Sequence, residues 1–305
     1  MQLSRPSGTA MLRSVQMTEY AGPDGLSDMQ ELVQRTWSPV SRLHLGDVAW
    51  ERSVNARRSS ANWRTAVWRD GDDVVAWGWL AQPGHLLMTV DPGRPELAAT
   101  VVEWFQATAD GPQLAAGVLE TERHLLAALE SAGFQLVDDA PYYTHHWISL
   151  DALAEPVVPE GLTLRHVQQD EVAKRAAAHR AAWSDLAPSK VTDDDMAEVM
   201  STWPYRPELD WVVENEAGDF VASALIWLDE QHQVGLVEPV GCAPEYRRRG
   251  LGAAVNLAAL HALREAGGTK AVVCPRGDDG YPQARALYQS FGFRPGSRTL
   301  HLLLG

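Results

Sequence analysis

Cysteine, basic residues and long apolar runs are all scarce in this 305-residue sequence. The two cysteines, Cys242 and Cys274, are too few for a disulfide framework, and together with the histidines they show no metal-ligand spacing. No apolar run approaches the ~20 residues that a membrane helix needs, and the first residues lack the apolar centre of a secretory signal. We therefore expect a cytoplasmic protein with two free cysteines, no membrane segment and no metal site.

Acidic residues outnumber basic ones. The chain has 40 Asp and Glu against 26 Lys and Arg, which gives a formal net charge of -14. A protein that mainly binds nucleic acid needs a basic face to neutralise phosphates, so this balance argues against such a partner. The negative charge either favours a cationic second substrate, such as an amine, through electrostatic steering or only keeps the protein soluble.

The most informative stretch is VGCAPEYRRRGLGAA, from Val240 to Ala254. An apolar strand end is followed there by a proline, three arginines and Gly250-Leu251-Gly252, where an alanine-rich helix begins. The first N–H groups of a helix lack partners within it, and the helix dipole makes that end partly positive. Glycine lets the backbone approach a ligand closely, and arginine supplies charged donors that suit a pyrophosphate. The segment therefore predicts a phosphate-binding loop.

The second half of the chain alternates strand and helix patterns. The patterns predict strands at 162–167, 210–214, 220–228, 233–242, 269–274 and 298–303, and helices at 169–183, 192–202, 252–266 and 282–290. The expected order is β-α-α-β-β-β-α-β-α-β.

The first half has a similar pattern. It predicts strands at 11–17, 63–68, 74–80 and 85–90, and helices at 24–37, 46–60, 96–108 and 122–132. The segment Ala128–Phe134 also matches Leu287–Phe293, about half the chain further on, which indicates an internal duplication. We expect one domain at residues 1–150, a proline-rich linker at 151–161 and a second domain at 162–305.

Two motifs taken together resemble the GNAT acyltransferase superfamily. The family pattern R/Q-x-x-G-x-G/A matches Arg247–Gly252, and the helix pattern A-x-x-L-Y-x-x-x-G-F matches Ala284–Phe293. The resemblance covers residues ~160–305 well by element order and the first half only in outline. The whole chain is similar to the tandem-GNAT proteins, the group that includes mycothiol synthase. The resemblance implies an α/β fold of two GNAT-like domains, each a mostly antiparallel mixed sheet flanked by helices.

The resemblance also implies a reaction. GNAT enzymes transfer an acetyl group from acetyl-CoA, usually to an amine. We therefore expect an N-acetyltransferase that acts on the amine of a small molecule by direct attack in a ternary complex. The alternatives are a non-catalytic acyl-CoA-binding or regulatory protein and a protein N-acetyltransferase. Either a monomer or a homodimer is compatible with the sequence.

The family's cofactor-binding positions carry over to this chain one by one. In the family, the motif amides bind the pyrophosphate, and the end of the preceding strand pairs with the pantetheine arm. The matching residues, which we expect to bind acetyl-CoA, are Val240, Gly241, Cys242, Arg247, Arg248, Arg249, Gly250, Leu251, Gly252 and Ala253. Many members also have an asparagine that contacts CoA, and Tyr281 takes its place here. That contact is therefore lost or comes from Arg276 or Asp279.

Two residues match the family's catalytic positions. A tyrosine on the last helix protonates the departing thiolate in this family, and here it is Tyr288. A phenol titrates near ~10 and a thiol near ~8.5, so the phenol still holds its proton at neutral pH. A carboxylate on the central strand usually takes the amine proton, and Glu238 is the candidate because it alternates onto the same strand face as Val240. Pro239 beside it removes one donor from the strand ladder, which indicates an edge or a local irregularity in strand pairing.

The first half departs from the family pattern. Its counterpart of the phosphate loop is Val90–Leu97, which has no G-x-G and has a proline in place of an amide donor. Leu129 stands at the position that corresponds to Tyr288. We therefore expect that the first domain neither binds CoA in the usual way nor catalyses.

Aromatic and acidic residues follow in the region where the family places acceptor specificity. They are Trp183, Trp203, Tyr205, Asp185, Asp193, Asp194 and Asp195. One interpretation is a pocket for a cationic or ring-bearing amine. The other is ordinary aromatic packing together with acidic capping of a helix start.

Overall fold

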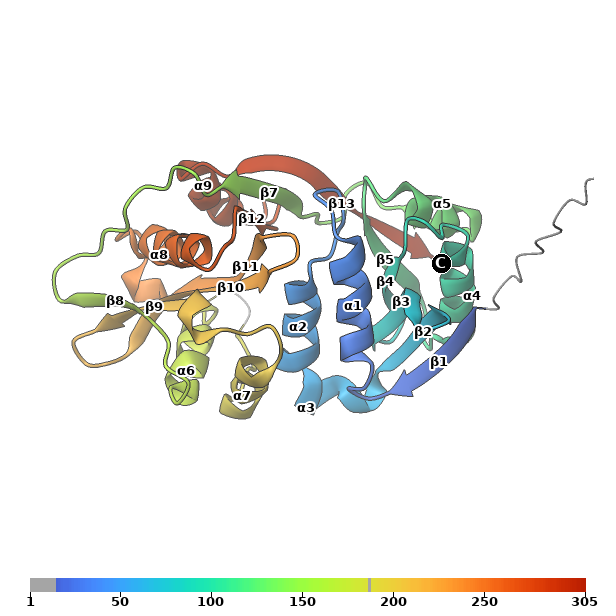
Figure 1. Ribbon diagram of the computed structural model, residues 1–305, viewed down its shortest axis with the longest axis horizontal. Coiled ribbons are helices and arrows are strands. Elements are labelled where there is room, and N and C mark those ends of the chain that lie inside the picture. The colour runs from blue at the N-terminus through green and yellow to red at the C-terminus, as the bar shows by residue number, and fades with distance from the viewer. Residues whose placement is uncertain (1–14, 186–187) are drawn as a thin grey trace, which may run out of the picture.

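A computed structural model describes residues 15–305, except 186 and 187, as a mixed α/β fold with helices packed on a long sheet (Figure 1). The first half contains β1 (Gln16–Ala21), α1 (Leu26–Thr36), α2 (Leu45–Val54), α3 (Ala56–Ser59), η1 (Ser60–Asn62), β2 (Arg64–Asp70), β3 (Asp73–Gln82), β4 (His85–Val90), α4 (Leu97–Thr108), β5 (Leu114–Leu119), α5 (Arg123–Ser131), β6 (Gln135–Leu136) and β7 (Thr144–Ser149).

The second half repeats this order. It contains β8 (Leu162–His166), α6 (Val172–Ala182), α7 (Asp193–Ser201), η2 (Pro207–Leu209), β9 (Asp210–Asn215), β10 (Phe220–Asp229), β11 (Val234–Cys242), η3 (Pro244–Tyr246), α8 (Leu251–Glu265), β12 (Lys270–Val273), α9 (Pro282–Ser290) and β13 (Arg294–Leu304). Apart from the short 3-10 helices, this is the order predicted from the sequence. The strand expected at 11–17 differs, because β1 begins at Gln16 and residues 11–14 lie outside the described part of the chain.

The strands of both halves join in one sheet. Among the described residues, the order is β1-β2-β3-β4-β5-β13-β7-β12-β11-β10-β9-β8, with β6 beside β13. Only β4 with β5 and β11 with β12 pair in parallel. The expected mostly antiparallel sheet is therefore confirmed.

The two halves exchange their last strands. β7, from the first half, pairs with β12 and with the start of β13. The end of β13 pairs in turn with β5 and β6 of the first half. The predicted boundary at residue 150 directly follows β7, so strand pairing crosses it. Residues 151–161 hold no helix or strand.

The helices pack on the sheet through four groups of buried apolar side chains. In the first half, alternate residues of β2 face α4 and α5 on one side and α1 on the other. In the second half, α8 and α9 share a core with the sheet. A fourth core combines α6 and α7 with Ala49, Trp50 and Val54 of α2. Helix α2, near the centre of Figure 1, thus packs into the second half of the molecule.

The matching segments at the ends of α5 and α9 adopt the same geometry. Gly133 and Gly292 both have a positive φ, of 92° and 107°. The phenylalanine after each glycine donates its N–H to Leu129 at 3.0 Å in the first half and to Tyr288 at 3.1 Å in the second. Glycine is favoured at such helix ends because it has no Cβ to oppose a positive φ. The internal duplication predicted from these segments agrees with this structure.

Candidate functional site

The two parallel strands β11 and β12 separate in the middle of the second half. They pair only from Val234 to Leu236 on β11, although β11 continues to Cys242. One edge of Val240–Cys242 pairs with β10. Within the described part of the chain, no strand pairs with the other edge. A ligand arm with amide groups can therefore add to this edge as a strand does.

A β-bulge lies beside this opening. The register between β10 and β11 shifts between Ala224 and Ile226, which leaves one extra residue in β11 at Glu238–Pro239. The indole N–H of Trp227 donates to the main-chain oxygen of Glu238 at 2.8 Å. The irregularity predicted at Pro239 is confirmed. Bulges of this kind redirect a side chain, and here the side chain is that of the predicted base.

The start of α8 has the open backbone that an anion requires. Gly250 caps the helix with a φ of 80° and no side-chain cap. The first helical hydrogen bond runs from the Ala254 N–H to Gly250 at 3.0 Å, so the N–H groups of Leu251–Ala253 precede the helical ladder. A Cβ on Gly250 would have no atom within 4 Å. These features suit a pyrophosphate.

The three arginines before this helix have different environments. Arg247 is committed to the protein, because its guanidinium contacts Asp185 at 2.7 Å and donates to the Ala182 carbonyl at 2.8 Å. Arg248 and Arg249 are exposed, and the Arg249 guanidinium lies 5.3 Å from the ring centre of Tyr246. Arg247 thus ties the loop to α6, while the two exposed arginines are available to a phosphate.

The segment before α9 is held by its own ion pairs. Arg276 contacts Asp278 at 2.6 Å, and Arg285 contacts Asp279 at 3.2 Å. Tyr281 is half-buried and precedes the first residue of α9. Arg276 and Asp279, which the sequence offered as substitutes for the missing asparagine contact, therefore already have protein partners.

Tyr288 is buried on α9 with its ring between two phenylalanines. The ring centre lies 6.0 Å from that of Phe291 and 5.6 Å from that of Phe293, both nearly edge-on. Burial, followed by the nearby carboxyl of Glu238, raises the pKa of the phenol. The phenol therefore keeps its proton at neutral pH.

A pocket of about 650 Å³ opens beside Glu238, between the two halves of the chain. Its wall includes a row of stacked rings, because His179 lies 5.4 Å from Trp50 and 4.4 Å from Trp183 between ring centres. Burial, reinforced by Arg175 and Arg180, lowers the pKa of His179 to about 3, so this imidazole is neutral. Glu51 of α2 also lines the pocket.

Two further carboxyl groups lie near Glu238, one of them, Glu51, in the wall of this pocket. Burial and the charges of Asp47 and Glu51 raise the pKa of Glu238 well above its ordinary value. Burial also raises the pKa of Asp47 to about 6. Asp47 and Glu51 belong to the first half of the chain, and the sequence analysis did not name them. Their spacing of four residues on a helix is the only local signal that they share a face.

Some of the residues predicted on the acceptor side line the pocket, and others serve core packing or helix capping. Trp183 lines the pocket, as the functional interpretation expects. Tyr205 instead donates to Asp210 at 3.2 Å and packs with Trp227 in the core. The three acidic residues start α7, where Asp195 forms a capping box with Thr192, so their capping interpretation is the observed one.

Two other predicted acceptor residues also lie elsewhere. The carbonyl of Trp203 accepts a hydrogen bond from Gln30 at 2.7 Å, and its side chain is exposed. Asp185 pairs with Arg247 beside the phosphate loop. Neither residue lines the pocket beside Glu238, so neither supports the acceptor role within the described part of the chain.

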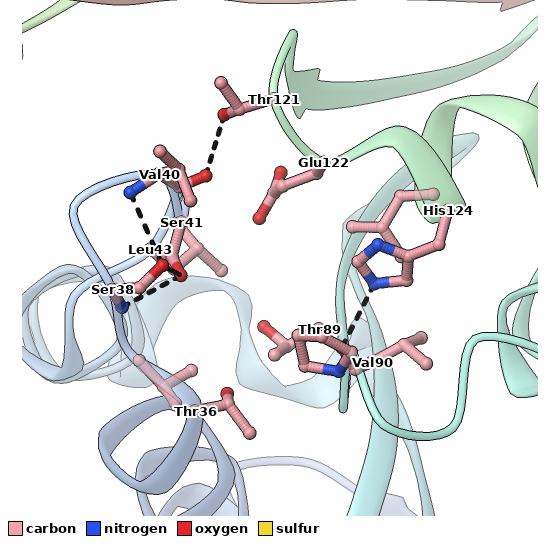
Figure 2. Close-up of a pocket in the computed structure, with 13 residues that line it drawn as sticks. Thr36, Ser38, Val40, Ser41, Leu43, Thr89, Val90, Thr121, Glu122 and His124 are labelled. Atoms are coloured by element: carbon pink, nitrogen blue, oxygen red, sulfur yellow. Dashed lines mark hydrogen bonds between the residues drawn. The ribbon is translucent and has the colours of Figure 1, made fainter.

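The first half has a smaller opening at the equivalent place. A cavity of about 160 Å³ lies at the ends of β4 and β5 (Figure 2). The loop between α1 and α2 lies against it, because Thr121 donates to the Val40 carbonyl at 2.7 Å and the Arg42 N–H donates to Glu122 at 3.0 Å. Arg94, the basic residue of the counterpart loop, pairs with Asp70 and Glu96.

Neither a metal centre nor a membrane helix is evident in the described ranges. Residues 15–185 and 188–305 hold no group of three or more His, Cys, Asp or Glu placed to bind a metal ion. Within those ranges, no helix is long and apolar enough to cross a membrane. Cys242 and Cys274 are both free.

Comparison with known proteins finds a family match in the second half of the chain. Residues 176–293 match the model of the Acetyltransferase (GNAT) family. No curated protein matches the sequence significantly.

Solved structures match nearly the whole chain in fold. A tandem GNAT protein from the clavulanic acid biosynthesis pathway has a TM-score of 0.63 and 17% identity, over 95% of this chain and 98% of its own. A GCN5-related N-acetyltransferase from Sphaerobacter thermophilus has a TM-score of 0.59 and 17% identity, over 94% of this chain and 95% of its own. A GNAT-family acetyltransferase from Colwellia psychrerythraea has a TM-score of 0.60 and 12% identity, over 96% of this chain and 100% of its own.

These identities are low enough that the solved structures establish the fold alone, and the likeness to mycothiol synthase stays a prediction. The family match and the common fold agree with the opening between β11 and β12 and with the loop before α8. Residues 176–293 therefore match the GNAT acetyltransferase family, within a chain that has the fold of tandem GNAT proteins.

Proposed function

We propose that this protein is an acetyl-CoA-dependent N-acetyltransferase that acts on the amine of a small molecule by direct attack in a ternary complex. The observation that carries the proposal is the position of Glu238. Its backbone belongs to the strand that opens toward the cofactor, and it also lines the 650 Å³ pocket. Its carboxyl is close enough to Tyr288 to raise the phenol's pKa. Cofactor, acceptor and proton donor would thus meet at one place.

The cofactor would lie along the free edge of β11. The amides of Leu251–Ala253 and the exposed Arg248 and Arg249 would bind the pyrophosphate, through the helix dipole and direct charge. The backbone of Val240–Cys242 would pair with the pantetheine amides. Arg247 would act indirectly, by holding the loop against α6.

The state of the nearby thiol supports transfer without an acyl-enzyme intermediate. Burial raises the pKa of Cys242 to about 11, so it is a thiol rather than a nucleophilic thiolate at neutral pH. The amine would therefore attack the thioester directly, with positioning as a main source of the rate. Tyr288 would protonate the departing thiolate, whose own basicity rises in the same apolar surroundings.

The pocket favours a small amine as the acceptor. Its volume is within the range of sites for small ligands. Glu51 provides a negative charge, and Trp50 and Trp183 provide aromatic faces, a combination that attracts a cationic group. Elements of both halves form its walls, which suits a small molecule better than a protein terminus.

A thiol-release assay tests the proposal. Free thiol released from acetyl-CoA would be measured across a panel of small amines, with a thermal shift on CoA alone as the companion experiment. We expect release with at least one cationic amine. A CoA-dependent thermal shift without release on any amine would instead indicate the non-catalytic CoA-binding alternative.

The Tyr288→Phe variant tests the acid role of Tyr288 in the same assay. We expect turnover to fall by about 10²- to 10⁴-fold, the usual contribution of a general acid, while CoA affinity stays the same. Tyr143→Phe, at an exposed tyrosine, is the matched control. Equal turnover in Tyr288→Phe and the wild type would remove the acid role.

A further inference from the structure

Helix α2 of the first half brings two carboxyl groups to Glu238 of the second. Asp47 and Glu51 are one helical turn apart and therefore lie on the same face of the helix. Glu51 lines the large pocket together with Glu238. Asp47 lines a separate, smaller cavity of about 130 Å³, together with Cys274.

Close packing fixes α2 in this place. Gly46 precedes Asp47, and a Cβ at Gly46 would lie 2.4 Å from the Trp227 Cβ. The helix can therefore approach β10 this closely only because residue 46 is glycine. Trp227 also donates to the main chain of Glu238 at 2.8 Å, so the same side chain contacts the helix and holds the strand.

The carboxyl of Asp47 is itself held in position. Its Oδ2 accepts the N–H of His44 at 2.6 Å, as part of a capping box at the start of α2. Its side chain also shares a hydrogen bond with the side chain of Glu238. Two carboxyl groups can hydrogen-bond only when one of them carries a proton.

We propose that Asp47 and Glu238 form a proton-sharing pair that accepts the proton of the acceptor ammonium. The first half of the chain then supplies part of the acid–base machinery of the second. Glu238 contacts the acceptor, and Asp47 acts through Glu238. This inference rests on the proposed amine acetylation.

Proton transfer from the ammonium to the pair precedes attack on the thioester. The ammonium gives one proton to the free oxygen of Glu238, and the proton already on Glu238 moves to Asp47. The neutral amine attacks the thioester carbon, the C–S bond breaks, and Tyr288 protonates the thiolate. The nitrogen of the new amide loses its remaining extra proton, which returns to Tyr288 through solvent. The pair then releases the proton that it gained from the ammonium to solvent. The net products are amide, CoA thiol and one proton.

The electrostatic surroundings support a pair that holds one proton between Asp47 and Glu238. Burial and the neighbouring carboxylates raise the pKa of Glu238 well above its ordinary value, whereas that of Asp47 is raised only to about 6, so Glu238 holds the shared proton more strongly than Asp47 does. Glu51 adds negative charge from α2, and Arg42 adds positive charge that lowers the pKa of Asp47. The other titratable groups near the pair are uncharged at neutral pH, because burial raises the pKa values of Cys274 and Tyr288 and lowers those of His44 and His179.

The Asp47→Asn variant tests the pair. Asparagine keeps the oxygen that caps α2 but cannot take the proton. Wild-type turnover should rise with pH through about 6, as the pair loses its first proton, and then level off. In Asp47→Asn we expect at least a tenfold fall at pH 7 and a shift of this rise to higher pH, because Glu238 must then ionise alone. CoA affinity should stay the same.

Asp195→Asn is the matched control, since Asp195 has the same capping-box role at the start of α7. It should leave the pH at which turnover rises unchanged. An Asp47→Asn enzyme with wild-type turnover and an unmoved pH profile would overturn the proposal.

Infrared spectroscopy provides a readout without substrate. The wild-type protein should show a protonated carboxyl at pH 7 that is lost in Glu238→Gln, and a second carboxyl that titrates near pH 6 and is lost in Asp47→Asn. Absence of these two signals would contradict the pair itself. Absence of thiol release on every amine would contradict the proposed function instead.

Discussion

Burial of the Glu238 side chain disfavours its ionised form. Its pKa in the folded protein is raised, so the folded chain keeps a proton that the unfolded chain loses above about pH 4.5. Stability should therefore fall as the pH rises from that value toward the folded-state pKa. This is the reverse of the behaviour of a salt-bridged carboxylate, and under the proposed function it is the stability cost of a carboxyl placed to act as a base.

The Glu238→Gln variant should show this cost directly. Glutamine is neutral at every pH and can still donate to Asp47, so we expect a higher Tm than wild type at pH 8 and a smaller difference at pH 5. Differential scanning calorimetry at both pH values measures the change. Glu245→Gln, at an exposed position close in sequence, should show no such pH-dependent gain. Parallel Tm values for Glu238→Gln and wild type would refute the argument.

Single residues of the site differ in how far the sequence could predict them. The motif located Gly250 and Tyr288, because each belongs to one local pattern that the structure keeps intact. Trp50 and His179 of the pocket, and Asp47 beside Glu238, were not predicted, since each takes its place only through packing of one element on another. No spacing in the sequence relates residues of α2 to a strand of the other half.

At the scale of elements, α2 and α8 begin in the same way and pack differently. Both have leucine as the first helical residue and glycine as the second. At Gly46 of α2, a Cβ would lie 2.4 Å from a Trp227 atom close to the main chain, whereas at Gly252 of α8 it would lie 3.3 Å from the mobile end of Leu287. The same sequence pattern therefore allows close packing in α2 and leaves more space at the start of α8, where the proposed cofactor would bind.

Alanine substitution at the two glycines tests this difference. Gly46→Ala should lower the free energy of unfolding by about 1–3 kcal/mol, the usual effect of overpacking, and should lower turnover because Asp47 moves. Gly252→Ala should change stability little, because the Leu287 end can turn aside. Urea denaturation compares the two variants with wild type. Equal stability of both would show that α2 does not need its close approach.

Three strands of the first half were not predicted from the sequence: β5, the two-residue β6, and β7. β5 is built largely of alanine and glycine, which have low strand propensity, and it forms because β4 and β13 pair with it. β7 contains His145-His146, and its place between β12 and β13 is set by residues more than a hundred positions away. Strand pairing of this kind is non-local, so local patterns do not reveal it.

At the scale of the molecule, the duplicated order of elements was predictable and the joining of the halves was not. Repeated patterns predicted two units. The exchange of β7 and β13, the single sheet and the shared core around α2 come from contacts between the halves. These contacts explain how an unequal pair of domains can serve one site. The first half contributes a helix to it, and the loop between α1 and α2 lies against its own smaller cavity.

The central claim is that the duplicated chain has one working cofactor site, at the start of α8. Calorimetric titration with CoA, on the wild type and on Gly252→Asp, tests it most directly. Aspartate is favourable at a helix start, so the fold should persist, but its charge repels a phosphate there. We predict one CoA per wild-type chain and no binding to Gly252→Asp. Two CoA per chain, or undiminished affinity in the variant, would contradict the account.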